Sequence, residues 1–364
     1  MSAPRPWNLI AELTYRCPLR CPYCSNPTDL AAHRDALDAD AWGRAFEEAR
    51  ALGVVHVGLT GGEPSARRDL EAIVRAAARA DLHVHLVTAG TPLDGERLAA
   101  LARAGLGSVQ LSIQDADPEA SDRIAGTEAF ARKLELARSA RELGLPLTLN
   151  VVLHRHNVGN VSALVALARR LGARRLELAN AQYHGFALRN RAALLPTAAQ
   201  VRAAAHAAEA ARAEAPALEI LFVLPDYFAG RPKPCMGGWA KSALVVAPDG
   251  RVLPCHGAAA LPLEFWSFPA RALRACWEDA PGMNAYRGES WMRAPCRTCP
   301  ERALDFGGCR CQAFALTGDA AAADPACALS PHHARIAEAR ARDAAEAGDG
   351  PGLAFRTWDE DAAR

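Results

Sequence analysis

Residues 8–24 read Asn8-Leu-Ile-Ala-Glu-Leu-Thr-Tyr-Arg-Cys17-Pro-Leu-Arg-Cys21-Pro-Tyr-Cys24, a short apolar run followed at once by a cysteine-rich loop. A run of this length is typical of a buried strand. Three cysteines in a C-x3-C-x2-C spacing can face one site, and thiolate ligands favour an iron–sulfur cluster or zinc. The stretch therefore predicts a strand whose carboxyl end carries a metal site.

The number of ligands separates these two kinds of metal site. A structural zinc site takes four ligands, and His33 is the one further Cys or His close to the loop. A zinc loop completed by His33 therefore stays open as an alternative. A cubane cluster held by only three thiolates leaves one iron open to bind another molecule.

Short apolar runs alternate with helical segments rich in Ala, Arg and Glu from Trp7 to about Leu224. The expected strands are residues 8–13, 54–59, 82–87, 108–113, 147–153, 174–178 and 218–224, and the clearest helices are 69–80, 96–104, 130–143, 161–171 and 197–213. This alternation predicts an α/β fold with a parallel sheet and crossover helices. Six or seven units suit a partial, open β/α barrel, whose chemistry gathers in the loops after the strands.

The alternation stops near Pro225, and this change divides the chain. We expect a barrel domain over residues 1–224 and a second domain over 225–330 that is rich in Pro, Gly, Trp and Cys. A region with so few periodic segments is expected to be stabilised by metal sites rather than by a large core. Residues 331–364 should form a charged helix over 332–347, without a convincing apolar face, and a loosely held acidic tail.

Other loops at the ends of expected strands carry polar and flexible residues. Thr60-Gly61-Gly62-Glu63-Pro64 follows the second strand, and its glycines let backbone approach a ligand while Glu63 offers an acceptor for an ammonium group. Ser112-Ile-Gln114-Asp115 follows the fourth strand and can hydrogen-bond a ribose, and Asn150 lies near the end of the fifth. The Gly-Gly pair follows the strand next in the chain after the cysteine loop. This position indicates a ligand-binding segment rather than only a tight turn.

Composition excludes several classes of partner. The chain has 364 residues and a formal net charge of +1, which argues against a nucleic acid gripped through its phosphates. No apolar stretch approaches the length of a membrane span, and the first residues lack a signal pattern. We expect a protein of the cytoplasm with no membrane and no nucleic-acid partner.

Eleven cysteines are present, and none lies between residues 25 and 234. In a reducing cytosol such clusters indicate metal or iron–sulfur sites rather than disulfides. The second set comprises Cys235, Cys255, Cys296, Cys299, Cys309, Cys311 and Cys327, one ligand short of two four-ligand sites. Asp305, between the two close pairs, could supply the missing ligand, and Cys276 is expected to be a buried core thiol. A pair of zinc knuckles stays open as the purely structural alternative.

The cysteine loop and the Gly-Gly-Glu-Pro segment resemble those of radical S-adenosylmethionine (SAM) enzymes. The resemblance implies that Cys17, Cys21 and Cys24 hold a 4Fe–4S cluster whose open iron binds SAM, and that a 5′-deoxyadenosyl radical is formed there. It further implies cofactor contacts from Tyr23, Gly61, Gly62, Glu63, Ser112 and Asn150. Many relatives have an Asp where this chain has Gln114, and an Arg at the position of Ile124.

The spacing of the second set resembles the auxiliary-cluster extension called the SPASM domain. Four segments are in addition similar to the pyrroloquinoline quinone (PQQ) biosynthesis protein E family: Leu111–Asp115, His154–Asn157, Glu177–Gly185 and Lys233–Trp239. This family joins a glutamate γ-carbon to a tyrosine ring carbon in a small precursor peptide. The resemblance implies a nearer auxiliary cluster at Cys235, Cys255, Cys309 and Cys311, and a farther one at Cys296, Cys299, Asp305 and Cys327.

The same resemblance implies the partners. They are the precursor peptide, a small peptide-chaperone protein that presents it, and an electron donor such as flavodoxin or ferredoxin. One auxiliary cluster would be 4Fe–4S, whereas four cysteines at the nearer site can hold either a 2Fe–2S or a 4Fe–4S cluster. Relatives often have Tyr and Trp where this chain has His184 and Phe186, and no catalytic base is assigned from the sequence.

Two other functions stay open at this point. The first is a radical SAM/SPASM enzyme of the same architecture that modifies a different ribosomal peptide or protein. The second is a non-catalytic electron carrier that uses the same thiolates, although such a protein has no need of the Gly61-Gly62-Glu63-Pro64 segment or of a β/α barrel.

Overall fold

The computed structural model describes residues 3–28, 33–181, 183–346 and 352–356, and a nine-stranded sheet forms its centre. The strand order is β7-β6-β5-β4-β3-β2-β1-β8-β9. Seven parallel strands come in chain order, which confirms the open β/α sheet: β1 (Asn8–Thr14), β2 (His56–Gly61), β3 (His83–Thr88), β4 (Leu106–Ser112), β5 (Leu147–Leu153), β6 (Arg175–Asn180) and β7 (Glu219–Phe222).

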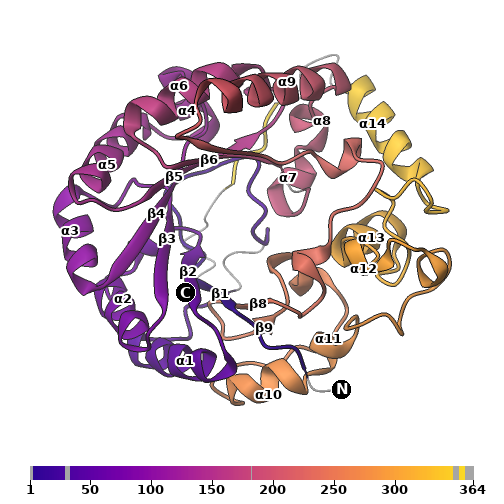
Figure 1. Ribbon diagram of the computed structural model, residues 1–364, viewed down its shortest axis with the longest axis horizontal. Coiled ribbons are helices and arrows are strands. Elements are labelled where there is room, and N and C mark those ends of the chain that lie inside the picture. The colour runs from indigo at the N-terminus through magenta and orange to yellow at the C-terminus, as the bar shows by residue number, and fades with distance from the viewer. Residues whose placement is uncertain (1–2, 29–32, 182, 347–351, 357–364) are drawn as a thin grey trace.

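Helices cover the outer face of this curved sheet (Figure 1). They are α1 (Ala39–Leu52), α2 (Leu70–Arg79), α3 (Gly95–Ala104), α4 (Pro118–Ala125), α5 (Phe130–Glu142), α6 (Val161–Leu171) and α9 (Ala198–Glu214). Several begin at a side-chain cap: Asp38 accepts from the Ala41 amide before α1, and Thr197 and Gln200 form a capping box at α9. These caps satisfy amides that a helix leaves without internal partners.

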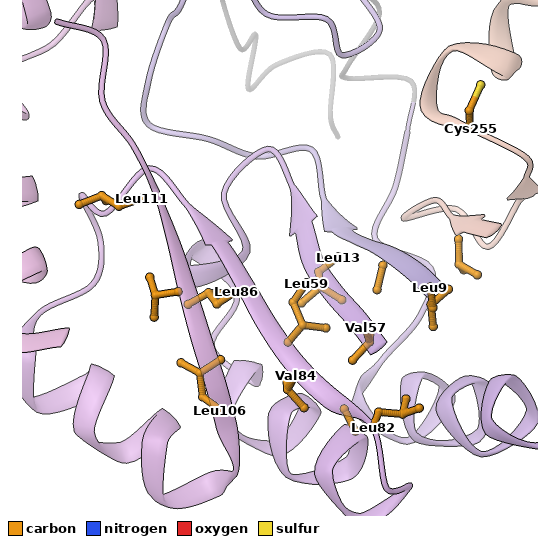
Figure 2. Close-up of a cluster of buried hydrophobic side chains, with 14 of the residues drawn as sticks. Leu9, Leu13, Val57, Leu59, Leu82, Val84, Leu86, Leu106, Leu111 and Cys255 are labelled. Carbon is orange, nitrogen blue, oxygen red and sulfur yellow. The ribbon is translucent and has the colours of Figure 1, made fainter. Parts of the chain in front are cut away.

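The main core lies between the strands and these helices. Figure 2 shows side chains of β1 to β4, among them Leu9, Leu59 and Leu86, gathered on the side of the sheet that faces the helices. Along β5 buried and half-buried residues alternate, as they do when alternate side chains point to opposite faces of a sheet. The half-buried set lines the inner side of the barrel, which leaves that side available for a polar site.

The cysteine-rich region returns to the same sheet. Its strand β8 (Ala243–Val246) pairs in parallel with β1, and β9 (Val252–Leu253) pairs antiparallel with β8. Beyond them lie short helices, α10 (Leu273–Glu278), α11 (Pro281–Asn284), α12 (Arg302–Asp305) and α13 (Arg310–Thr317), on the open side of the barrel (Figure 1). The boundary expected at residue 225 therefore stays a prediction, because the region beyond it extends the sheet of the first.

The last helix, α14 (Ala334–Glu346), corresponds to the charged helix expected over 332–347. Contrary to expectation it has a buried face, formed by Ile336 and Ala339, which belong to a second apolar cluster. Asp343 pairs with Arg191 at 2.6 Å, and both side chains are largely buried. The described ranges contain no helix long and apolar enough to cross a membrane.

Candidate metal centres and cofactor cavity

A cavity of about 450 Å³ opens at the carboxyl ends of the parallel strands. It is lined by Thr60 and Gly61 of β2, Thr88 of β3, Ser112 of β4, Val152 of β5 and Asn180 of β6, and by Cys17, Cys21, Tyr23 and Cys24 of the loop after β1. The structure thus brings the three cysteines, Tyr23, Gly61, Gly62 and Ser112 around one space. Clefts at this end of a parallel sheet are where ligands bind.

The cysteine loop is tightly folded and its thiols are largely shielded. The Cys24 amide donates to the Cys21 carbonyl at 3.2 Å, which turns the second and third thiols toward the same side. Burial raises the pKa of the Cys17 thiol to about 12, although the nearby Arg356 guanidinium lowers it. Iron binding would remove this penalty, because a coordinating thiol is deprotonated by the metal.

Positions 61 and 62 require glycine, because the backbone of another segment lies too close for a side chain. A Cβ atom on Gly62 would lie 2.4 Å from the Tyr15 carbonyl oxygen, and one on Gly61 would lie 2.2 Å from that of Thr14. The Gly62 amide also donates to the Thr14 carbonyl at 2.6 Å. The pair therefore presses the loop after β2 against the start of the cysteine loop, and its exposed backbone lines the cavity.

Glu63 differs from the sequence-based expectation. Its side chain is fully buried and does not line the cavity. The carboxylate accepts from the Ser65 amide at 2.9 Å, the Ser65 hydroxyl at 2.5 Å, the Thr88 hydroxyl at 2.8 Å and the Ala89 amide at 2.5 Å. In this structure Glu63 joins the loops after β2 and β3, with both carboxylate oxygens in hydrogen bonds to protein groups, and its contact with an ammonium group stays a prediction.

The loop after β4 is linked to the cysteine loop through polar side chains. Gln114 donates to the Tyr23 hydroxyl at 3.0 Å and accepts from Lys133, whose ammonium also donates to the Ser112 carbonyl at 3.1 Å. Burial lowers the pKa of Lys133 to about 8. Lys133 was not predicted as a site residue, because an isolated Lys in a helical segment carries no sequence signal.

Asn150 is not brought into the cavity. It pairs in register with Ser112, but its amide donates to Glu177 at 3.2 Å, and Val152, two residues further along the same face, lines the space instead. Asn180 at the end of β6 does line the cavity, and its buried amide nitrogen finds no hydrogen-bond partner among the residues that the structure describes. Such a group is expected to meet a polar ligand.

Four cysteines of the second set lie together. Cys255 and Cys311 approach to 4.0 Å between their sulfur atoms, and both contact further thiols, those of Cys235 and Cys309 respectively. Thiol hydrogen bonds lower the pKa of Cys255 well below its usual value and raise that of Cys311. Four neighbouring thiols of this kind could hold an iron–sulfur cluster, which would bind all four as thiolates.

The remaining predicted ligands lie around a second point. Cys296 and Cys299 flank a short 3-10 turn, and Asp305 and Cys327 are close enough to Cys296 to raise the pKa of its thiol, with burial as the larger cause. Asp305 is mostly buried, and its carboxylate accepts from the Gly307 amide at 2.8 Å. The grouping matches the prediction, while the ligand role of each residue stays a prediction.

None of the eleven cysteines, all within the described ranges, forms a disulfide. Cys276 is fully buried in α10, as expected for a core thiol. Across those same ranges no three His, Cys, Asp or Glu side chains are arranged to hold a single metal ion. His33, the fourth ligand considered for zinc, pairs with Asp249 at 3.2 Å and does not line the cysteine cavity.

Two smaller spaces lie between the cysteine loop after β1 and the second set of cysteines. One, of about 360 Å³, is lined by Ser25 of the first loop and by His184, His256 and Gly257. A Cβ on Gly257 would lie 3.2 Å from the Cys311 sulfur, so this space reaches the four-cysteine group. Asn180, His184 and Cys309 are among the residues that line the other space. His184 therefore lines both spaces.

Comparison with known proteins agrees with this geometry. The family model described as the Radical SAM superfamily matches residues 11–168. The structure of Streptococcus suis SuiB bound to S-adenosylmethionine superposes with a TM-score of 0.72 at 19% identity, covering 86% of this chain and 75% of that one. The sheet, the cavity and the cysteine loop therefore define a radical SAM enzyme.

Relatives in sequence narrow this class. The chain is 54% identical to the PqqA peptide cyclase of Methylocella silvestris over 344 residues, 93% of this chain and 92% of the relative. It is 52% identical to the PqqA peptide cyclase of Streptomyces rochei over 354 residues, 96% of each chain. The chain belongs to the PqqA peptide cyclase family.

As a radical SAM enzyme the protein uses SAM and a 4Fe–4S cluster, and the residues present fit this pair. Three neighbouring thiols supply soft ligands and leave a fourth iron position for SAM. The unpartnered Asn180 amide and the open backbone of Gly61 and Gly62 offer polar contacts in the same space.

Proposed function

We propose that the chain catalyses the carbon–carbon crosslink between a glutamate and a tyrosine side chain of the PQQ precursor peptide. The observation that carries this proposal is the likeness to PqqA peptide cyclases along nearly the whole chain. It is supported by the cavity beside Cys17, Cys21 and Cys24 and by a second space lined by Gly257, next to Cys311. A protein that only carried electrons would not need the strand-end cavity lined by Gly61, Gly62 and Ser112.

In this proposal Cys17, Cys21 and Cys24 hold the radical cluster, and Tyr23, Gly61, Gly62 and Ser112 contact SAM. Cys235, Cys255, Cys309 and Cys311 hold one auxiliary cluster, and Cys296, Cys299, Asp305 and Cys327 the other. Glu63 and Asn150 act indirectly. Glu63 holds the loop after β3, and Asn150 joins β5 to β6 through its hydrogen bond to Glu177. The proposed domain division at residues 224 and 330 follows these groups.

The reaction balances as a two-hydrogen oxidation. When held by these residues, SAM and the cluster would supply the radical that takes one hydrogen atom, and the auxiliary clusters would supply an acceptor for one electron. The second hydrogen leaves the tyrosine ring as that electron and a proton, so that one carbon–carbon bond replaces two carbon–hydrogen bonds. The space around His184 is where the chain brings polar side chains between the two cysteine groups.

The proposed partners are those that the family likeness implies. The peptide and a small chaperone that presents it act together with a low-potential electron donor, flavodoxin or ferredoxin, in the cytoplasm. A near-neutral net charge and the lack of a spanning helix in the described ranges are in keeping with this setting. One auxiliary cluster is proposed to be 4Fe–4S and the nearer one either 2Fe–2S or 4Fe–4S.

The test is a reconstitution under anaerobic conditions with SAM, a reductant, the precursor peptide and its chaperone, read by mass spectrometry. A peptide lighter by two hydrogens, with fragments that link the glutamate to the tyrosine, is expected. A modified peptide without that link would favour another reaction of the same architecture. Zinc without iron and sulfide in the anaerobically purified protein would overturn the iron–sulfur assignment.

A further inference from the structure

We propose that residues 352–356 form a strap that completes the radical site, and that Arg356 is a positioning residue which clamps the cysteine loop and supplies a buried positive charge to its cluster. The sequence predicted cofactor contacts only as far along the chain as Asn150 in the fifth strand. It placed residues 352–356 in a loosely held tail. The proposal rests on the proposed function only in placing the cluster at Cys17, Cys21 and Cys24.

Arg356 contacts the cysteine loop at three points. One guanidinium nitrogen donates to the Leu19 carbonyl at 2.7 Å and to the Cys17 carbonyl at 3.0 Å, and the other lies 3.8 Å from the Cys24 sulfur. The residue is only 3% exposed and lines the cavity beside the three thiols. A guanidinium presents its donors in a rigid planar fork, whereas a Lys ammonium is a compact charge on a flexible stem.

The rest of the strap is fixed independently of Arg356. Both backbone groups of Ala354 bind the side chain of Asn190, at 2.7 and 2.8 Å, and the same side chain donates to the Pro22 carbonyl within the cysteine loop at 2.8 Å. The Arg356 amide donates to the Arg20 carbonyl at 3.1 Å. Asn190 is itself buried between these segments.

Side chains of the strap also pack. Leu353 packs against the second apolar cluster, against which Tyr23 of the cysteine loop also packs. Phe355 lies above Gly126, where a Cβ atom would be 3.2 Å from its ring and 2.8 Å from the Cβ of Arg20. Four consecutive residues, Leu353 to Arg356, therefore make specific contacts with the cysteine loop or the elements beside it, which a loosely held tail would not do.

The positive charge of Arg356 lies close to the three cysteines of the loop, where a thiolate-bound cluster would place negative charge. Cys17, Cys21 and Cys24 all interact electrostatically with its guanidinium, and Arg20, the cation within the loop itself, is exposed. A buried cation stabilises the more negative, reduced form of a thiolate-bound cluster, and so raises its reduction potential. Through Arg356, residues 352–356 thus influence the reduction potential of the cluster at Cys17, Cys21 and Cys24.

The experiment compares Arg356→Gln, Arg356→Lys and the matched control Arg20→Gln, which removes an exposed charge from the same loop. The first readout is amide hydrogen exchange of residues 17–24 before cluster reconstitution. Loss of a charge-assisted hydrogen bond should speed exchange about tenfold or more in Arg356→Gln. The control should exchange like the unaltered protein.

The second readout is a potentiometric titration followed by electron paramagnetic resonance, using the signal that changes when SAM is added. A more negative potential is expected in Arg356→Gln, with the potential largely restored in Arg356→Lys and unchanged in Arg20→Gln. If Arg356→Gln does not fold, Arg356→Lys decides: faster loop exchange with a retained potential supports the strap.

Unaltered exchange and an unaltered potential in the Arg356 variants would overturn the inference while leaving the proposed function intact. Failure of the proposed function looks different, because the unaltered protein would then yield no glutamate–tyrosine link, whatever the exchange rates and potentials of the Arg356 variants. Asn190→Ala provides an independent arm: it removes the anchor of Ala354 and should also speed loop exchange, and normal exchange in this variant would contradict a fixed strap.

Discussion

Single buried charges shape the radical site more than the sequence motifs suggest. Lys133 is completely buried, and the two acceptors of its ammonium hydrogen bonds, the Gln114 amide oxygen and the Ser112 carbonyl, are neutral. Burial lowers its pKa, and nearby Cys21, Cys17, Asp122 and Glu63 oppose that shift. With an Asp at position 114 the ammonium would instead be neutralised by its neighbour.

Glu63 gives the first prediction at this scale. Glu63→Gln replaces one acceptor oxygen by an amide nitrogen that faces the Ser65, Thr88 or Ala89 donors. Leaving a buried donor unsatisfied costs about 1–3 kcal/mol, so urea unfolding without SAM should show a loss of that size. Were Glu63 instead a direct partner of the SAM ammonium, stability would stay the same and only SAM affinity would fall.

His85 gives a prediction about pH, far from the cysteines. Burial and the neighbouring His56 lower its pKa to about 4, against about 6.5 in an unfolded chain. The unfolded state therefore binds more protons between these values, and stability is present above pH 6.5 and lost as pH falls toward 4. The two values correspond to about 3 kcal/mol at most.

The measurement is the free energy of unfolding across this pH range. His85→Gln should flatten the acid side of the profile, because a neutral amide has no proton to gain. The control is His206→Gln, a change at an exposed residue of α9, and it should leave the profile as it is. A profile of unaltered steepness in His85→Gln would contradict the prediction.

At the scale of elements, the periodic part of the chain was predictable. The strand expected over 147–153 and the helix over 161–171 agree with β5 and α6 to the residue. The strand expected over 218–224 shortened to Glu219–Phe222, since only four residues pair with β6 at the sheet edge. Strong periodicity and local caps determine such segments.

Elements whose partners are distant in sequence could not be predicted. The four residues of β8 are too few for a periodic pattern, and they become a strand because β1 offers an unpaired edge. The same holds for site residues. Cysteine spacing pointed to both metal groups, whereas Arg356 joins the site through contacts with residues more than 330 positions earlier.

The turn between α12 and α13 gives the element-scale prediction. Asp305 accepts from the Gly307 amide, so a purely structural cap would be preserved by Asp305→Asn, which keeps an acceptor oxygen. An anionic iron ligand would not be preserved, and a shifted spectrum or potential of the farther cluster with a lower crosslinking yield is expected. Asp305→Ala should in addition lose stability. Wild-type spectra and crosslinking in Asp305→Asn would remove Asp305 from the ligand set.

On the scale of the whole molecule, the two cysteine groups belong to different parts of one continuous sheet. The first follows β1, and Cys255 of the second lies just beyond β9, two strands away in the sheet order. Because β8 pairs directly with β1, the sheet itself connects the region of the second cysteine set to the loop that carries the first. The spaces around His184 lie between them.

This arrangement predicts that the groups bind iron separately. Cys17→Ala should abolish 5′-deoxyadenosine formation while most of the iron and sulfide of the auxiliary groups is retained. Iron analysis and chromatography of the reaction mixture measure the two quantities, and Cys276→Ala serves as a matched control at a core thiol. Deoxyadenosine at the wild-type level in Cys17→Ala would overturn the assignment of the radical site.

The pairing of β8 with β1 also has a consequence for synthesis on the ribosome. Residues 8–14 emerge early, yet their second neighbour in the sheet, residues 243–246, is made only after the seven parallel strands. Until then one edge of β1 offers unpaired amides and carbonyls, which invite association with other chains. Nascent chains that stall before residue 243 should therefore aggregate or recruit chaperones, and full-length yield should depend on how quickly translation passes that point.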